Sequence, residues 1–520
     1  MDEIELKLTL DEAGERRLRT SRTLRAMTRG RATTDRLETL YFDTADWRLR
    51  DAGIAFRLRR KNGEWIQTVK AGREMRGGLS HAREVEVALD EPVPAIEKVS
   101  DEGLRETIRG AVGNAELASR AETVIRRQKR MLEHGGSLIE FALDSGEVVA
   151  GDRSEPLREA EFELIEGDPP ALFEAAAAIF DRGPVQFSGD SKGERGYRLA
   201  TQGTSQLPLR PRKAFSVDLD AAMSTEEALR AILAECLEQI TTNAAVVVEA
   251  DDPEGPHQLR IGLRRLRAAL RLVPKSDSPP PFAHLRDEAR RLGQAAAAVR
   301  DIDVLRGEML ARAGGLPEEG TAALDRALAE RAGTARSALR RTLAAAETQS
   351  FLFEVASAVA AGVPRRRAGD LGVDLLGRTI CDTMGEALDR RWKSVRGHAK
   401  GIAGLTVEGR HALRKELKAL RYTVEFAEPL WSGGRLKEFL KDLKTLQDVF
   451  GSLNDVAMAE AVLMGDDPPA ARHGEARLAA GLLIGAERPR AERDWAGAKA
   501  AWKALKKDGP FWERPPRGAG

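Results

Sequence analysis

The arrangement of apolar and polar positions along the chain changes close to residue 200. Up to that point, short stretches alternate between apolar and polar residues, strictly in EIELKL (3–8) and over most of AFRLRR (55–60), REVEVAL (83–89) and EAEFELIE (159–166). An alternation with a period of two is typical of β-strands that bury one face. Glycine-containing connectors such as KNGEW separate these stretches, as turns between strands do. The first part of the chain is therefore predicted to form mainly an antiparallel sheet.

Beyond residue 215, apolar residues recur every three or four positions, which is the spacing of amphipathic helices. The preceding segment, 203–215, contains Pro, Gly, Ser and Gln with few apolar residues and is predicted to be a linker. We therefore expect an α+β multidomain protein. Its predicted parts are a β-rich domain at 1–202, an all-α domain at 216–508 and a tail at 509–520.

The helical half contains an internal repeat. The segment HQLRIGLRRLRAALRLV begins at His257, and HALRKELKALRYTVEFA begins at His411, 154 positions later. An acidic turn follows each copy at nearly the same distance. A match over this length predicts a duplicated helical bundle, with repeats at about 216–360 and 370–508.

Composition narrows the class of protein. The 83 Lys and Arg residues nearly balance 82 Asp and Glu, and the net charge of +1 argues against a globally basic nucleic-acid-binding protein. Cys236 and Cys381 have no motif spacing, which argues against a disulfide framework or a zinc site. We see no signal peptide, and the apolar runs are too short to cross a membrane. These features predict a cytoplasmic protein with no membrane partner and no specific nucleic-acid partner.

The polar faces of the predicted strands are sorted by the sign of their charge. Arg57 and Arg59 share the face of a middle strand, whereas Glu159, Glu161 and Glu163 share the face of a late strand. Like charges side by side repel, so each face needs a neutralising partner. One interpretation is a sheet with a solvated face, and the other is a closed barrel whose polar faces point inward. A ligand for both faces would combine phosphate groups for the bases with a divalent metal for the acids.

Several of these segments resemble, in the same order, the signatures of the CYTH superfamily of triphosphate tunnel metalloenzymes. The resemblance begins with Glu-x-Glu-x-Lys in EIELKL and runs on through LYFDTADWRLRDAGIAFRLRRKNGEWIQTVKAG, SHAREVEV, IEFALDSGEVVAGDRSEPLREAEFELIEG and SKGERGYRL. It covers residues 1–200 and is closest to the bacterial inorganic triphosphatases. It implies an eight-stranded antiparallel β-tunnel that hydrolyses a terminal phosphate with a divalent metal, Mg²⁺ or Mn²⁺.

The resemblance also implies roles for individual residues. Metal-binding roles fall on Glu3, Glu5, Asp144 and the strand that carries Glu159, Glu161 and Glu163, of which the resemblance does not identify the matching pair. Phosphate-binding roles fall on Lys7, Arg57, Arg59, Lys70, Arg127 and Lys192. Because the segment IRRQKRML lacks the aromatic residue usual in the family, Arg126 and Arg130 are alternatives to Arg127. Tyr41 and Lys70 match a pair that helps to activate water.

Each copy of the helical repeat carries basic residues at helical spacing. They are His257, Arg260, Arg264 and Arg267 in the first copy, and His411, Arg414, Lys415, Lys418 and Arg421 in the second. A solvated stripe paired with acids is one interpretation, but like charges at this spacing are destabilising, and the stripe occurs twice. The repeated H-x-x-R helix resembles the CHAD domain over roughly 216–508. That resemblance implies a two-fold helical bundle whose basic surface, with these residues, binds inorganic polyphosphate.

The combined expectation is a divalent-metal-dependent triphosphatase that hydrolyses inorganic tripolyphosphate and carries a polyphosphate-binding helical domain. The expected partners are tripolyphosphate and polyphosphate, and the expected location is the cytoplasm, with association with polyphosphate granules. One alternative is a non-catalytic polyphosphate-binding protein. Others are a CYTH adenylyl cyclase and a triphosphatase acting on nucleoside or thiamine triphosphate. The sequence leaves the metal preference and the oligomeric state open.

Overall fold

The chain forms two compact units. The computed structural model describes residues 2–61, 63–76, 79–183, 186–274, 281–362, 376–431, 433–469 and 473–513. The first unit comprises Met1–Leu209 together with Ala344–Ala361, and the second comprises Arg210–Leu343 together with Gly362–Gly520. A short segment from the helical half of the sequence therefore belongs to the β-rich unit.

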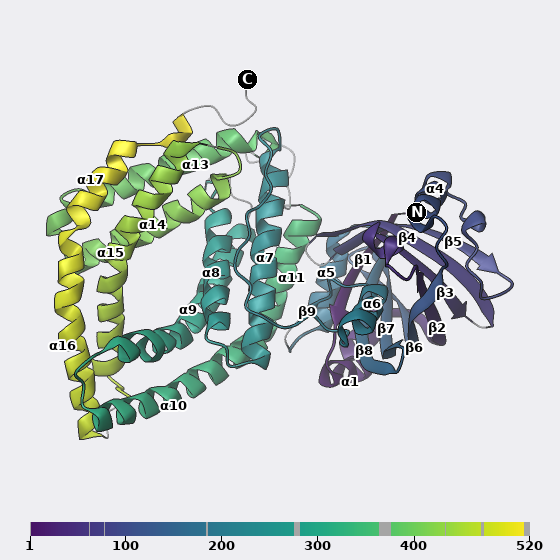
Figure 1. The fold of residues 1–520 in the computed structure, drawn as a ribbon, viewed down its shortest axis with the longest axis horizontal. Helices are drawn as coiled ribbons and strands as arrows, with labels where there is room; N and C mark the ends of the chain where they lie inside the picture. Colours follow the sequence, from purple (N-terminus) through teal and green to yellow (C-terminus); the bar gives the residue numbers. More distant parts are fainter. Residues whose placement is uncertain are drawn as a thin grey trace. The chain divides into compact units, whose positions relative to one another are not determined.

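The first unit is built around an antiparallel sheet that closes on itself (Figure 1). Its long strands are β1 (Asp2–Thr9), β2 (Thr28–Asp43), β3 (Ile54–Lys61), β4 (Glu64–Arg76), β5 (Leu79–Leu89), β6 (Ala118–His134), β7 (Ser137–Ala150) and β8 (Arg153–Glu166). Their order is β5-β4-β3-β2-β6-β7-β8-β1, and β1 also pairs with β5, which closes the barrel. The two-residue strand β9 (Gln186–Phe187) adds to β1. The predicted eight-stranded antiparallel tunnel is confirmed, with β9 as an addition.

Alternation along the strands separates an apolar outer face from a charged inner face. On β3 and β4, Phe56, Leu58 and Val69 are buried and pack with Leu104 and Ile108 of a covering helix. Because side chains alternate across a strand, the basic neighbours on β3 point to the opposite side. The helices of this unit are α1 (Glu12–Thr20), α2 (Arg22–Met27), α3 (Arg48–Asp51), α4 (Glu102–Val112), α5 (Pro170–Ile179), α6 (Lys192–Gln202) and α11 (Ala346–Ala360).

Helix α6 fills part of the barrel interior. A Cβ atom added to Gly193 would lie 2.9 Å from the ring of Tyr41, and one added to Gly196 would lie 2.5 Å from Ala121 of β6. Only glycine allows this close approach of the helix backbone to the inner face of the strands. The helix joins an apolar cluster with residues of β2, β6, β7 and β8. Its first residue, Lys192, is thereby held beside the charged part of the interior.

The long elements of the second unit that the structure describes are helices. Its first set of helices is α7 (Thr225–Glu249), α8 (Glu254–Ala269), α9 (Pro281–Val304) and α10 (Glu318–Leu343), and a π-helical turn (Leu305–Leu310) follows α9. Its second set is α13 (Ile380–His398), α14 (Val407–Ala427), α15 (Gly434–Met464), α16 (Gly474–Ala496) and α17 (Ala498–Asp508). The prediction of a helical region after the β-rich domain is confirmed.

The two sets of helices meet at equivalent positions. Ser224, which caps α7, forms a β-bridge with Thr379, which caps α13. One residue further along α7, Thr225 Oγ1 lies 2.7 Å from Thr383 Oγ1, and both side chains are buried. Helix α7 has the length and apolar composition of a membrane span, yet 56% of its apolar window is buried and it packs against α8 and α10. It therefore serves as a core helix of this unit.

Candidate functional site

A cavity of about 1040 Å³ occupies the interior of the barrel and is lined by charges of both signs. Its acids include Glu5, Glu84, Glu86, Glu140, Glu161 and Glu163, and its bases include Lys7, Arg57, Arg59, Lys70, Arg127, Lys129 and Lys192. The solvated-face interpretation of the strand pattern is therefore wrong for this face. The strands turn their charged faces inward, toward one enclosed volume.

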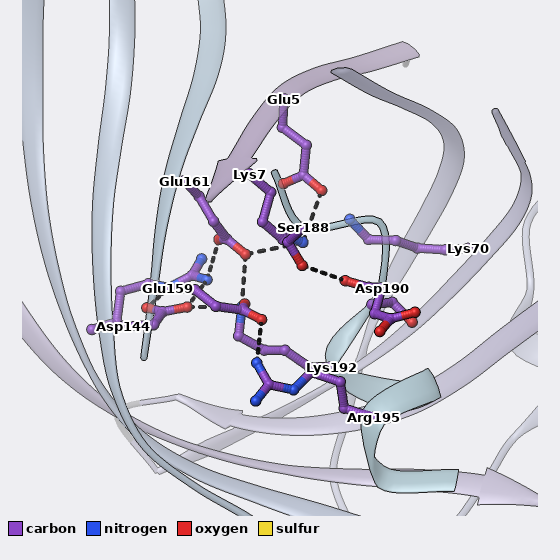
Figure 2. A network of polar contacts seen from close by, with 12 residues as sticks. Glu5, Lys7, Lys70, Asp144, Glu159, Glu161, Ser188, Asp190, Lys192 and Arg195 are labelled. Carbon is purple, nitrogen blue, oxygen red and sulfur yellow. Dashed lines mark hydrogen bonds and ion pairs between the residues drawn. The ribbon is translucent and has the colours of Figure 1, made fainter. Parts of the chain in front are cut away.

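The acids of β7 and β8 converge on one ammonium group (Figure 2). In the register of the sheet, Lys7 lies opposite Glu161, and Asp144 lies opposite Glu159. Lys192 Nζ lies 2.9 Å from Asp144 Oδ2, 2.7 Å from Glu159 Oε2 and 2.6 Å from Glu161 Oε1. Asp144 and Glu159 are fully buried, so these carboxylates depend on cations for their charge balance.

Arg127 is the second cation of this network. Its guanidinium donates to both oxygens of Asp144, at 2.8 and 2.6 Å, and to Glu161 Oε2 at 2.5 Å. Arg126, the alternative one position earlier, is exposed. The alternation on β6 thus places Arg127, rather than Arg126, in the network.

The network keeps its members ionised. Burial alone would raise the pKa of Glu161, but Arg127, Lys192 and Lys7 hold it well below its ordinary value. Burial likewise opposes the charge on Lys192, yet the surrounding carboxylates raise its pKa well above the ordinary range. The pKa of Lys7 is raised in the same way by Glu161 and Glu5, against burial. Close cations therefore hold the pKa of Glu161 below its ordinary value, and Arg127 and Lys192 do the same for Asp144 against burial.

The opposite wall of the cavity is basic. Glu84 of β5 joins two of its bases, since Arg57 Nη2 lies 3.1 Å and Lys70 Nζ 3.0 Å from its carboxylate. The Nε of Arg59 is buried and makes no hydrogen bond among the described residues. Burial, followed by the charges of Arg57 and Arg127, lowers the pKa of Arg59 to about 10. An anion that enters the cavity would stabilise the buried, positively charged form of Arg59.

The two residues expected to activate water both line this cavity. Tyr41 lies opposite Arg57 in the pairing of β2 with β3, and its side chain is buried. Lys70 lies opposite Glu84 in the pairing of β4 with β5 and is half-buried. The closed barrel therefore brings both residues to one volume.

The acidic side has the chemistry of a site for a hard divalent cation. Carboxylate oxygens of Asp144, Glu159 and Glu161 lie within 4.8 Å of one another. Glu159 Oε2 is buried and accepts no hydrogen bond among the described residues, although Lys192 Nζ lies 2.7 Å away. Oxygen ligands of this kind suit Mg²⁺ or Mn²⁺. Glu5 and Glu163 line the cavity nearby, and the side chain of Glu3 lies outside the described part of the structure.

Several residues of this site carry no motif that marks them in the sequence. Arg195 of α6 donates to Glu159 Oε1 at 3.0 Å, and Lys129 forms an ion pair with Glu140 at 2.5 Å across β6 and β7. Glu84 was visible in the alternation of REVEVAL but not as a partner of Arg57 and Lys70. Pairing between distant strands determines these contacts, so only the inward direction of the strand residues could have been read from the sequence.

The second unit contains a separate basic cavity of about 740 Å³. It is lined by the predicted residues His257, Arg260, Arg264, Arg414, Lys418 and Arg421, from α8 and α14. The other three predicted residues are placed elsewhere. Arg267 does not line this cavity, and His411 and Lys415 line another hollow.

Crowding of cations weakens the charge on Lys418. Burial, followed by the charges of Arg414, Arg264 and Arg260, lowers its pKa to about 6. Arg414 is affected in the same way, and burial together with Arg264 lowers its pKa to about 10. The acids of the cavity only partly offset these cations, with Arg260 Nη1 at 3.7 Å from Asp301.

Two family models match the chain, a CYTH domain over residues 1–197 and a CHAD domain over residues 231–464. An inorganic triphosphatase of Haemophilus influenzae is 29% identical over 167 residues, which cover 31% of this chain and 45%, less than half, of that protein. An uncharacterised protein of Mycobacterium tuberculosis is 25% identical over 504 residues, covering 91% of this chain and 90% of that protein.

The crystal structure of the CHAD domain from the plant Ricinus communis resembles this chain with a TM-score of 0.50 and 27% identity. The similarity covers 59% of this chain and 99% of that domain. The order of the two family matches agrees with a β-barrel unit that is followed by a helical unit. The chain therefore contains a CYTH domain followed by a CHAD domain.

Proposed function

We propose that the barrel hydrolyses inorganic tripolyphosphate in a reaction that depends on a divalent metal, Mg²⁺ or Mn²⁺, and releases phosphate. The observation that carries the proposal is the barrel cavity, which is lined by many bases and by several carboxylates, with the buried carboxylate cluster of Asp144, Glu159 and Glu161 next to it. A compact ligand that satisfies both walls must be strongly anionic and associated with a cation. The name of the Haemophilus relative points to the same class of substrate.

The basic wall is suited to grip the phosphate groups. Arg57 and Arg59 of this wall, and Lys7 of β1, supply charge-assisted donors, which are strongest when the acceptor is charged and water is excluded. The Nε of Arg59, which has no hydrogen-bond partner among the residues that the structure describes, is a donor that a phosphate oxygen can satisfy. Positioning and charge neutralisation of this kind account for most of the catalysis of phosphoryl transfer.

The acidic wall is suited to hold the metal. A divalent cation held by Glu3, Glu5, Asp144 and the acids of β8 would neutralise charge on the triphosphate as the bond to the terminal phosphate breaks. Among the three glutamates of β8, Glu161 and Glu163 line the cavity, whereas Glu159 is bound to Arg195 and Lys192. This favours Glu161 and Glu163 as the cavity-facing ligands. Lys192 and Arg127 keep Asp144 and Glu161 ionised.

Lys70 is the candidate group for accepting a proton from the attacking water, with Tyr41 on the same wall. Its ammonium is held by Glu84 at 3.0 Å, which fixes its position in the cavity. If Lys70→Met left the rate and its pH profile unchanged and only weakened substrate binding, the base role would be wrong.

We further propose that the basic cavity of the CHAD domain binds inorganic polyphosphate. The support is the gathering of six predicted basic residues from both repeats around one volume. In addition, the buried Nε of Arg414 has no hydrogen-bond partner within the described part of the chain. On this proposal, the protein is cytoplasmic and associates with polyphosphate granules through this cavity. The alternative is that the whole chain is a non-catalytic polyphosphate-binding protein.

Phosphate release separates these two proposals. The purified chain is incubated with tripolyphosphate, ATP, thiamine triphosphate or long-chain polyphosphate. Each substrate is tested in the presence of Mg²⁺, Mn²⁺ or EDTA. In the samples with ATP, formation of cyclic AMP is measured as well. We expect release from tripolyphosphate that requires metal, is lost in Glu5→Gln, and persists in the control Glu147→Gln, whose side chain is exposed. Turnover that survives EDTA or Glu5→Gln would refute the tunnel mechanism. Polyphosphate binding without any turnover would favour the alternative.

A further inference from the structure

Helix α11 lies in the sequence of the helical half but packs in the first unit. Residues Ala344–Ala361 group with the barrel, where α11 packs against α5 and β4. The amide of Gly183, shortly before β9, donates to the carbonyl of Ala344 at 2.9 Å. The sequence repeat assigns the same residues to the end of the first helical repeat. The helix is therefore an element of the barrel unit that the chain supplies late.

One side chain of α11 joins a row of aromatic rings behind the acidic wall. The ring of Phe353 lies 6.4 Å from that of Phe180 and 5.6 Å from that of Phe187, in an edge-to-face arrangement with the latter. Phe180 in turn lies 6.3 Å from Phe162, which follows Glu161 on β8. Because neighbours on a strand face opposite sides, Phe162 points outward where Glu161 points inward. Phe353 is thus fully buried on the outer side of this wall.

Strand β9 is held on β1 from two directions. Its two residues pair with Leu8 and Thr9 of β1. Phe187 is one of the two, and its half-buried ring meets the ring of Phe353 edge-to-face at 5.6 Å. The contact with Phe353 therefore adds to the backbone pairing an interaction from outside the sheet.

The position of Lys192 depends on β9 as well as on the packing of α6. The amide of Ser188 donates to the carbonyl of Lys7 at 2.9 Å, which continues the alignment of the chain along β1. Three residues later Ser191 caps α6 in a capping box with Glu194, and Lys192 is the first residue of the helix. The ammonium of Lys192 then reaches the carboxylates of Asp144, Glu159 and Glu161. Phe187 of β9 lies five positions before Lys192, so the alignment of β9 bears on where this ammonium lies.

We propose that α11 is part of the catalytic unit and that Phe353 is a positioning residue for Lys192. The proposal rests on the proposed triphosphatase function for its catalytic consequence. It gives the late helix a role in the barrel that neither the CYTH match, which ends at residue 197, nor the CHAD match assigns. Phe353 acts through Phe187 and β9, and it does not itself touch substrate.

The test compares Phe353→Ala with Ile108→Ala in the full chain. Ile108 is equally buried but packs in the cluster of α4 with β2 to β5. Hydrogen exchange is measured on peptides covering 186–192 and 102–112, without substrate, and kcat/KM is measured with tripolyphosphate and metal. We expect Phe353→Ala to speed exchange in 186–192 and to lower kcat/KM on the order of 100-fold, as misplacement of an active-site group does. Ile108→Ala should speed exchange in 102–112 only.

A double-mutant cycle identifies the route. In a Lys192→Met background, Phe353→Ala should lower kcat/KM little further, because the side chain whose position it controls is already absent. Phe353→Leu, which keeps a large apolar side chain, should retain most of the activity. If the Phe353→Ala protein does not fold, Phe187→Ala, which removes the same ring contact from the side of β9, serves as the test variant. Unchanged exchange in 186–192, or an equal loss of kcat/KM in the Lys192→Met background, would overturn the proposal. Absence of turnover in the unaltered chain would refute the proposed function, and the exchange data would still test Phe353.

Discussion

Replacing Glu161 with glutamine would remove the central negative charge of the barrel interior with little change of shape. Its carboxylate lies 2.5 Å from Arg127, 2.6 Å from Lys192 and 3.1 Å from Lys7. At about 3 Å and an effective dielectric constant of about 20, each cation attracts it by about 5 kcal/mol, and the cost of burial opposes this attraction. Removing one partner of a buried ion pair usually destabilises a protein by about 3–5 kcal/mol. We expect Glu161→Gln to reduce the stability of the barrel unit by that amount at pH 7.

The loss should depend on pH in a defined direction. The pKa of Glu161 is held well below 4.5 in the folded protein, chiefly by Arg127 and Lys192 acting against burial. The carboxylate therefore contributes its full stabilisation above its unfolded pKa of about 4.5. This contribution is lost as the pH falls below that value toward the folded pKa. The difference in stability between Glu161→Gln and the unaltered protein should therefore become smaller as the pH falls below about 4.5.

Hydrogen exchange of β8 peptides in increasing urea measures the free energy of unfolding of the barrel unit alone. A separate value for this unit is needed because the chain has two units. The matched control is Glu147→Gln on β7, because its carboxylate is exposed and should contribute less than about 1 kcal/mol. Equal or higher stability of Glu161→Gln at pH 7 would refute the reasoning. It would mean that the buried cations are not held by this carboxylate.

Three further predictions concern the two cavities. Arg59→Leu should raise the KM for tripolyphosphate roughly 10- to 100-fold, which is the value of a hydrogen bond to a charged group. The melting temperature should not fall, because Arg59 Nε has no hydrogen-bond partner among the described residues. A lower melting temperature with an unchanged KM would contradict this prediction. Polyphosphate affinity, measured by calorimetry, should fall as the pH rises through about 6, because Lys418 loses its proton there. Lys418→Met should flatten this dependence of affinity on pH. An equal dependence on pH in both proteins would show that Lys418 is not the titrating group. Removal of metal with EDTA should abolish phosphate release but leave polyphosphate binding by the CHAD domain intact, and loss of both together would indicate one composite site.

The period of the strand pattern was sufficient to predict which side chains share a face. It predicted that Arg57 and Arg59 lie on one side of β3 and that Glu161 and Glu163 lie together on β8. The choice between an inner and a solvated face needed the closure of the barrel, because alternation is the same in an open sheet. The contact between Lys7 and Glu161 depends on the pairing of β1 with β8, which brings together residues more than 150 positions apart. Only the family resemblance indicated that closure from the sequence.

Helical periodicity was less informative about position. It predicted basic faces in both repeats, yet only some of these residues line the cavity, and His411 and Arg267 do not. A spacing of three or four identifies neighbours along one helix, but the packing of other helices determines which part of the face meets a cavity. The same limit applies to α11, whose apolar pattern predicts a helix but not the unit against which Phe353 packs.

The chain passes between its two units at three points, after residues 209, 343 and 361. A protease that cuts once in the segment 203–215 would therefore leave α11 attached to the CHAD fragment while the helix remained packed in the barrel unit. The two fragments should then copurify under native conditions and separate only in denaturant. For the same reason, the amino-terminal piece expressed alone would lack one of its own helices, and supplying residues 344–361 as a separate peptide should complement it.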